Sequence, residues 1–235
     1  MTPFVSELIG TGLIIILGNG VVANAVLHKT YGHAGGWIVI TFGWAMAVFV
    51  AVFVTAATSG AHLNPAVTIA LAMVGKFSWA KAPMYIIAQL LGAMLGSLIV
   101  WIVYRNHFDE TPNPAAKQAA FCTSPAIENT LHNFLSETIA TFIFILGALF
   151  IVASKNSLGS LDALPVALLV FAIGLSLGGT TGYAISPVRD LGPRIMHAIL
   201  PIKDKGPVNW KYSWIPIAGP ITGCLLASLV YLLLQ

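Results

Sequence analysis

Six apolar runs, each of about twenty residues, restrict this chain to the membrane proteins. An α-helix rises about 1.5 Å per residue, so such a run is long enough to cross a hydrocarbon core about 30 Å thick. Only 8% of the residues are charged, against about 25% in soluble domains. The predicted membrane-spanning helices cover residues 4–27, 37–57, 82–104, 134–154, 163–181 and 212–234.

Two shorter semi-apolar pieces, residues 64–74 and 186–197, lie between the second and third spans and between the fifth and sixth. Each is about half a membrane long, so each is either an interfacial helix or a re-entrant one. Asn64 and Ser186 are favoured N-cap residues, and a proline follows each at the first helical position. Both pieces are therefore predicted to be helices. A further Asn-Pro-Ala, at 113–115, lies among polar residues and is expected to be loop.

Internal repetition favours the re-entrant alternative. Ser6 and Glu7 match Ser136 and Glu137, and further along the chain Gly60 matches Gly182. The predicted single transmembrane domain, residues 1–235, thus contains repeat one at about 4–104, a linking loop at 105–131 and repeat two at about 132–234. Each repeat crosses the membrane an odd number of times, so the second is inverted and the two half-helices meet near the midplane.

The segments that lead into the half-helices are candidates for the lining of a pore. Irregular backbone at membrane depth is tolerated only where it is buried or lines a water-filled cavity. Two facing helix N-termini would oppose cations there and admit neutral hydrogen-bonding molecules. Arg189 can reach this lumen. Asp190 is interpreted as a structural partner, with Arg194 as its candidate partner, in preference to the alternative of a pore-lining role. The expected lining residues are Gly60, Ala61, His62, Thr181, Gly182 and Ala184; His62 is equally compatible with simple packing.

The motifs GAHLNPAVTIA (60–70) and GYAISPVRDLGP (182–193), set in a duplicated six-span chain, resemble those of the aquaporin superfamily and, within it, the glycerol facilitators. The resemblance implies an all-α right-handed bundle of six transmembrane helices with two re-entrant half-helices, four protomers each with its own pore, and no cofactor. It implies a location in the plasma membrane with both termini cytoplasmic, although the distribution of Lys and Arg among the loops opposes this orientation.

The same resemblance implies roles for individual residues. The selectivity filter would consist of Trp44, Gly174, Tyr183 and Arg189, with Gly174 leaving room where strict water channels carry a bulky residue. Glu7 and Glu137 resemble the family's carboxylates that hold the loop backbones. The paired central motifs would be Asn64, Pro65 and Ala66 in repeat one and Ser186, Pro187 and Val188 in repeat two.

Ser186 departs from the family pattern, in which this position is usually Asn. Serine keeps a capping oxygen but lacks the two amide donors. The start of the helix is therefore expected to survive, while discrimination among small neutral solutes is expected to weaken.

The predicted function is passive conduction of glycerol, water and other small neutral solutes, for example dihydroxyacetone, hydrogen peroxide or protonated lactic acid. The alternatives are a water-selective channel and, in another class, a coupled secondary transporter, since inverted repeats with broken helices occur there too. A membrane enzyme is disfavoured because the sequence shows no nucleophile and base pair and no metal-ligand spacing. The net charge of +3 is too small to indicate a nucleic-acid partner. The apolar spans make membrane lipid the expected surroundings.

Overall fold

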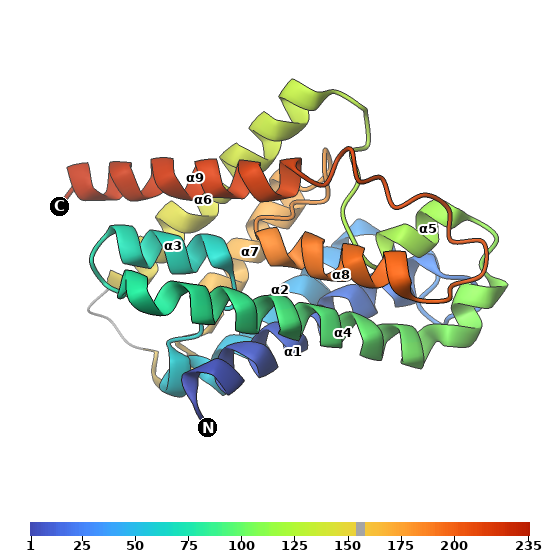
Figure 1. Ribbon diagram of the computed structural model, residues 1–235, viewed down its shortest axis with the longest axis horizontal. Coiled ribbons are helices and arrows are strands. Elements are labelled where there is room, and N and C mark those ends of the chain that lie inside the picture. Colours follow the sequence, from blue (N-terminus) through green and yellow to red (C-terminus); the bar gives the residue numbers. More distant parts are fainter. Residues whose placement is uncertain (154–157) are drawn as a thin grey trace.

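The computed structural model describes residues 1–153 and 158–235 and shows an elongated all-helical bundle (Figure 1). Within these residues there is no β-strand. The α-helices are α1 Pro3–Val26, α2 Gly36–Ser59, α3 Pro65–Met73, α4 Ala82–Glu110, α5 Pro114–Ala119, α6 Thr130–Ala153, α7 Leu164–Leu177, α8 Pro187–Ile199 and α9 Ile215–Leu233, with 3-10 turns η1 Trp79–Lys81 and η2 Gly159–Leu161.

Five helical stretches in the described part of the chain are long and apolar enough to cross a membrane. They correspond to five of the six expected spans. The sixth, expected at 163–181, is the apolar helix α7, which has only 14 residues and is therefore about 21 Å long. It ends at Gly178 and Gly179, where the chain turns into the loop that precedes α8. Residue 154, the end of the expected fourth span, lies outside the described residues.

The region between the repeats differs from the expected loop at 105–131. Helix α4 continues to Glu110, and α6 already begins at Thr130. The Asn-Pro-Ala at 113–115 was predicted to be loop, and this is wrong. The Asn113 side chain accepts a hydrogen bond from Ala115 N at 2.9 Å and caps the short helix α5. The same N-cap chemistry operates in this polar setting as at Asn64, because capping does not depend on burial.

The two halves of the chain form equivalent helix pairs, α1 with α4 and α6 with α9. Glycines permit both pairs to pack closely, since a Cβ at Gly92 would lie 2.3 Å from Leu8 O and one at Gly223 would lie 2.4 Å from Thr138 O. Small residues at helix contacts are typical of membrane bundles, where packing rather than hydrophobic burial holds helices together. Leucine, isoleucine and phenylalanine remain exposed on the outer faces, as lipid contact requires.

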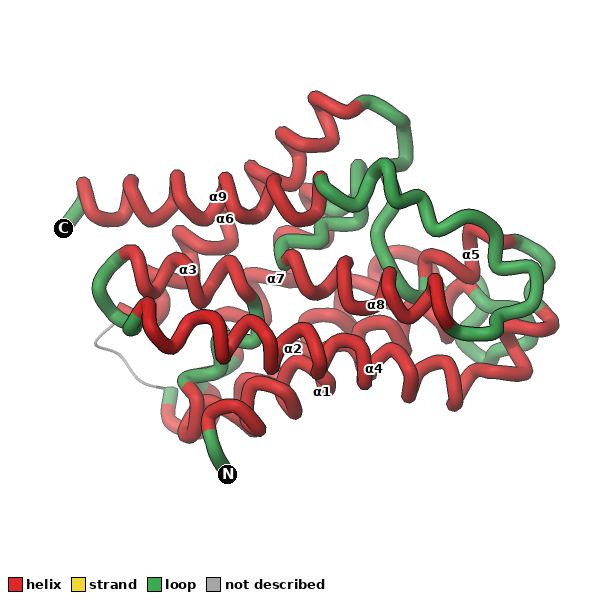
Figure 2. Tube along the Cα trace, viewed as in Figure 1, coloured by secondary structure: helices red, strands yellow, loops and turns green. Residues whose placement is uncertain are grey.

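Helices α3 and α8 lie end to end along the long axis, with their N-terminal ends toward each other near its centre (Figure 1). Much of the loop structure gathers around α5 at one end of the molecule (Figure 2), and both termini lie toward the other end. This arrangement brings the loops that precede α3 and α8 into the interior of the bundle.

Candidate functional site

The two loops that lead into α3 and α8 repeat one unusual backbone conformation. Gly60 and Gly182 both have a φ of 82°, and the non-glycine residues after them are also left-handed: φ is 49° at Ala61 and 38° at Tyr183. The pattern returns two residues later, at Leu63 with 53° and Ile185 with 44°. Such residues cost about 1–3 kcal/mol each and persist only where their surroundings hold them.

Glu7 provides that support in repeat one. Its carboxylate is fully buried and accepts hydrogen bonds from His62 N at 3.0 Å and Leu63 N at 2.7 Å. Two further donors, Ser59 Oγ at 2.6 Å and Gln89 Nε2 at 2.8 Å, complete its coordination. A buried carboxylate is tolerated when its oxygens are saturated with donors in this way.

Glu137 does the same in repeat two. It is also fully buried, and it accepts from Ala184 N at 3.0 Å, Ile185 N at 3.2 Å and Thr181 Oγ1 at 2.6 Å. The geometry therefore agrees with the backbone-holding role expected for both acids from the sequence.

The helix starts at Asn64 and Ser186 are capped as the sequence predicts. Asn64 Oδ1 accepts from Ala66 N at 2.9 Å, and Ser186 Oγ accepts from Arg189 N at 3.4 Å. Asn64 does more, because its Nδ2 donates across to Ile185 O at 2.8 Å. This bond joins the two loops directly.

Between the loops and the surrounding helices lies an internal cavity of about 220 Å³. Ten of the residues predicted as filter, motif or lining contribute to its wall, namely Trp44, Gly60, Ala61, His62, Asn64, Tyr183, Ala184, Ser186, Val188 and Arg189. The wall does not include Pro65, Ala66, Gly174, Thr181, Gly182 or Pro187. Thr181 and Gly182, expected in the lining, instead lie behind it, with Thr181 bonded to Glu137 and Gly182 packed on Thr123.

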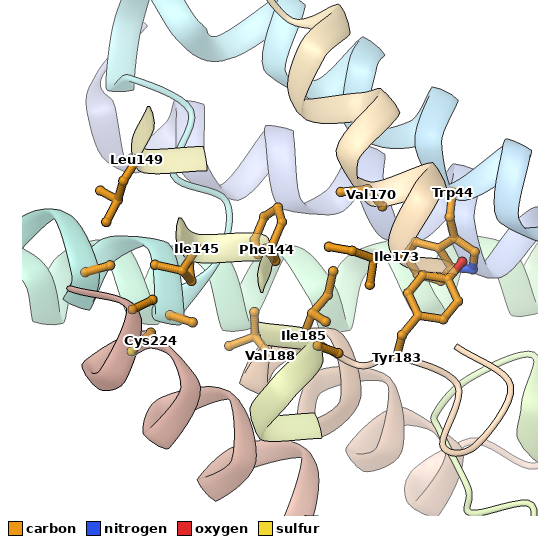
Figure 3. Close-up of a cluster of buried hydrophobic side chains, with 14 of the residues drawn as sticks. Trp44, Phe144, Ile145, Leu149, Val170, Ile173, Tyr183, Ile185, Val188 and Cys224 are labelled. Atoms are coloured by element: carbon orange, nitrogen blue, oxygen red, sulfur yellow. The ribbon is translucent and has the colours of Figure 1, made fainter. Parts of the chain in front are cut away.

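Apolar side chains make up much of the rest of the wall. Figure 3 shows Trp44 and Tyr183 toward one end of the buried cluster, with Leu149 toward the opposite end. Ile185 and Val188, on either side of the α8 cap, lie between these ends. The cavity thus combines an apolar surface with a few polar groups at fixed positions, as small-molecule sites commonly do.

Arg189 is half-buried, and its guanidinium carbon lies 4.3 Å from the centroid of the Trp44 ring. In the described part of the chain, Arg189 Nη1 and the Tyr183 hydroxyl are both buried without a hydrogen-bond partner. An unsatisfied buried donor costs about 1–3 kcal/mol, so these two groups leave polar capacity unused beside the cavity.

Gly174 was expected to leave open space in the selectivity filter, but neighbouring side chains fill the space where its own side chain would be. A Cβ there would lie 2.9 Å from Tyr183 Cζ and 2.9 Å from Thr41 Cγ2. One turn on, a Cβ at Gly178 would lie 2.4 Å from Tyr183 Cδ1. The two glycines form the surface on which the tyrosine ring rests, and Trp37 packs against the same ring at a centroid distance of 5.9 Å.

His62 both lines the cavity and packs, so neither alternative excludes the other. Its ring lies 4.5 Å from that of Phe77 and 4.8 Å from that of Tyr85, and its Nδ1 is 3.2 Å from Thr68 Oγ1. The side chain is therefore fixed in one position beside the central motif.

Asp190 pairs with Arg194, as the sequence suggested. Its Oδ1 accepts from Arg194 Nε at 2.7 Å and its Oδ2 from Nη2 at 2.9 Å, with both side chains fully buried. Thr123 adds two donors to the carboxylate, and Arg194 also donates to Val208 O at 2.6 Å. The pair ties α8 to the link between the repeats and to the loop before α9.

Sequence reasoning missed Ser59, Thr68, Gln89 and Thr123 as members of these networks. Ser59 could have been found, since Gly182 and Gly60 differ by 122 positions and the same difference relates Thr181 to Ser59. Gln89 and Thr123 come from distant helices and loops, and no spacing in the sequence points to them. No group of three or more His, Cys, Asp or Glu suited to a metal occurs among the described residues.

The membrane-length helices define an integral membrane protein, and two capped loops line a cavity inside it. The model of the major intrinsic protein family matches residues 1–231. The chain belongs to this family.

Its relatives include a probable glycerol uptake facilitator protein of Thermotoga maritima, 52% identical over 231 residues that cover 98% of each chain. The glycerol uptake facilitator protein of Bacillus subtilis is also 52% identical, over 98% of this chain and 84% of the relative. Among solved structures, the aquaglyceroporin of Plasmodium falciparum matches with a TM-score of 0.85 and 36% identity, over 97% of this chain and 93% of that one.

Proposed function

We propose that this protein is a passive channel for glycerol, water and other small neutral solutes. The observation that carries the proposal is the corner of the cavity formed by Trp44, Tyr183 and Arg189. It combines aromatic surface with two polar groups that lack protein partners. A polyol presents a carbon chain and hydroxyls, and these match the two kinds of surface. The names of the facilitator relatives support the same solute.

In this proposal Trp44, Tyr183 and Arg189 form the selectivity filter, and Gly174 acts through the tyrosine ring that it supports. Asn64 and Ser186, with Pro65, Ala66, Pro187 and Val188, form the centre, where α3 and α8 point their positive dipole ends at the passage. A cation would meet a barrier there, while a neutral molecule would not.

A coupled transporter fits the geometry less well. Its ion site would require an available acid, but the carboxylates of Glu7 and Glu137 are already occupied by backbone and side-chain donors. A strictly water-selective pore is the second candidate, and the glycerol measurement below separates the two.

The surroundings of the channel are also part of the proposal. We place it in the plasma membrane as a homotetramer, with both termini cytoplasmic. The position of both termini at one end of the bundle agrees with this topology.

The test is stopped-flow light scattering on proteoliposomes under an inward glycerol gradient. Rapid shrinkage followed by reswelling much faster than that of empty liposomes is expected. Rapid shrinkage with reswelling no faster than that of empty liposomes would establish a water-selective pore instead.

A further inference from the structure

No hydrogen bond fixes the ring of Tyr183, although this ring forms part of the cavity wall. The Tyr183 hydroxyl is buried and has no partner among the described residues. The main chain that follows is held by the Glu137 carboxylate, which accepts from Ala184 N and Ile185 N. These bonds fix the backbone of the loop. The position of the tyrosine ring is therefore set by the groups packed around it.

Trp37, in the first turn of α2, packs against this ring. The two ring centroids are 5.9 Å apart with an interplanar angle of 78°, the edge-to-face arrangement that aromatic pairs favour. A Cβ at Gly178 would lie 2.4 Å from Tyr183 Cδ1 and 2.9 Å from Trp37 Cζ2, so the two side chains meet over this glycine. Tyr183 lines the cavity and Trp37 does not. The indole thus lies behind the tyrosine ring, on the side away from the cavity.

The indole is itself anchored to α7. Its Nε1 donates to Gly174 O at 2.9 Å. Gly174 lies in the last turn of α7, where main-chain carbonyls lack partners within the helix, so this bond supplies one. Gly174 and Gly178 are the surface on which the ring of Tyr183 rests. Trp37 therefore holds both the ring and the helix end that supports it.

The same face of α2 carries Trp44, seven residues further along the chain. Seven residues make about two helical turns, so Trp37 and Trp44 lie on one side of the helix. Trp44 contacts Arg189, whose guanidinium carbon is 4.3 Å from the ring centroid. Helix α2 thus supplies one aromatic surface of the cavity directly, through Trp44, and positions a second, Tyr183, through Trp37.

We propose that Trp37 is a positioning residue of the selectivity filter, which limits the width of the filter by holding Tyr183 in the cavity wall. Without the indole, the tyrosine ring can move back into the space behind it, and the filter widens. A solute larger than glycerol then gains more than glycerol does. This inference deepens the proposed function, on which it rests. It makes Trp37 a specificity-determining residue that does not itself touch the solute.

The replacement Trp37→Leu removes both the indole donor and the aromatic edge. The test compares the permeability of proteoliposomes to xylitol, a longer polyol, with their permeability to glycerol. Loss of an aromatic pair and of one hydrogen bond should raise the ratio of xylitol to glycerol permeability about fivefold. Trp37→Phe keeps a ring beside Tyr183 but loses the donor, so the ratio should rise by about twofold.

Trp79→Leu is the matched control, because Trp79 is an exposed tryptophan in the turn η1. Its ratio of xylitol to glycerol permeability should equal that of the wild type. A double variant separates positioning from general support. If Trp37 acts through Tyr183, adding Trp37→Leu to Tyr183→Leu should change the ratio no further.

Additive effects of the two replacements would overturn the proposal, as would an unchanged ratio in Trp37→Leu, which is the result that a merely structural role gives. If Trp37→Leu does not fold, the ratio measured for Trp37→Phe decides the question. Failure of the proposed function is distinguishable, since the wild type itself would then show no glycerol flux above empty liposomes.

Discussion

The guanidinium of Arg189 lies over the face of Trp44, with its central carbon 4.3 Å from the ring centroid. The indole comes from α2 and the arginine from the first turn of α8, so one contact joins the two repeats. Because Arg189 Nη1 has no hydrogen-bond partner among the described residues, the indole is a principal restraint on the position of the cation.

Trp44→Leu should therefore weaken glycerol conduction. Loss of the aromatic face removes a desolvated cation–π contact of about 1–2 kcal/mol, so glycerol permeability is expected to fall about fivefold or more. Trp44→Phe keeps an aromatic face and should retain more of the activity than Trp44→Leu. Reswelling rates in proteoliposomes measure both, and equal rates for the two variants would show that the ring face is not used.

Gly174→Ala should displace the ring of Tyr183. The added Cβ would lie 2.9 Å from Tyr183 Cζ and 2.9 Å from Thr41 Cγ2, so the ring must move. Over-packing of this kind costs about 1–3 kcal/mol and should lower both the melting temperature and the glycerol flux. Gly179→Ala is the matched control, because a Cβ there has no atom within 4 Å. A flux in Gly174→Ala equal to that of the control would contradict the supporting role of Gly174.

Glu7→Gln and Glu137→Gln should each destabilise the loop that the acid supports. Glutamine keeps the shape of the side chain but replaces one carboxylate oxygen with an NH2 group. In the wild type the carboxylate oxygens accept hydrogen bonds from backbone N–H groups, and an NH2 group cannot. Leaving such buried donors unpaired costs about 1–3 kcal/mol. The expected result is a lower melting temperature in detergent for both variants. Glu128→Gln, at an exposed position, should leave it unchanged; equal melting temperatures for all three would refute the role of the acids.

Mercurial reagents should leave conduction unaffected. Cys122 and Cys224 are both buried, and neither lines the cavity. Burial also raises the pKa of the Cys122 thiol to about 12, so the reactive thiolate is scarce at neutral pH. Ala148→Cys places a thiol in the cavity wall and should confer inhibition that a reducing thiol reverses. Inhibition of the wild type at the same concentration would show that one of the native cysteines is reached.

The sequence predicted best what depends on local chemistry and on repetition. The caps at Asn64 and Ser186, the pairing of Asp190 with Arg194 and the five membrane-length helices follow from N-cap preference, helical spacing and apolar length. The matching positions of Glu7 and Glu137 in the two repeats predicted that the two acids have equivalent roles.

Other features depend on long-range contact and escaped prediction. A span predicted from hydropathy ends where the apolar residues end, which placed the end of the third span at 104. Helix α4 continues to Glu110 because helical hydrogen bonds do not require a membrane. The partnership of Gly174 and Gly178 with Tyr183 depends on how α7 faces a loop, which residue spacing does not encode. Gln89 joins the Glu7 network from across the bundle for the same reason.

The repeated left-handed turns have a consequence for how such a passage can change. Where a loop's path is fixed by buried acids behind it, its main-chain groups are the same whichever side chains the loop carries. A substitution at Ala61 or Ala184 alters the packing and leaves the amide chemistry in place. In the proposed channel, Trp44, Tyr183, Ser186 and Arg189 are the wall positions that act through their side chains. Substitutions there are expected to change which solute is conducted, while the backbone of the two loops stays the same.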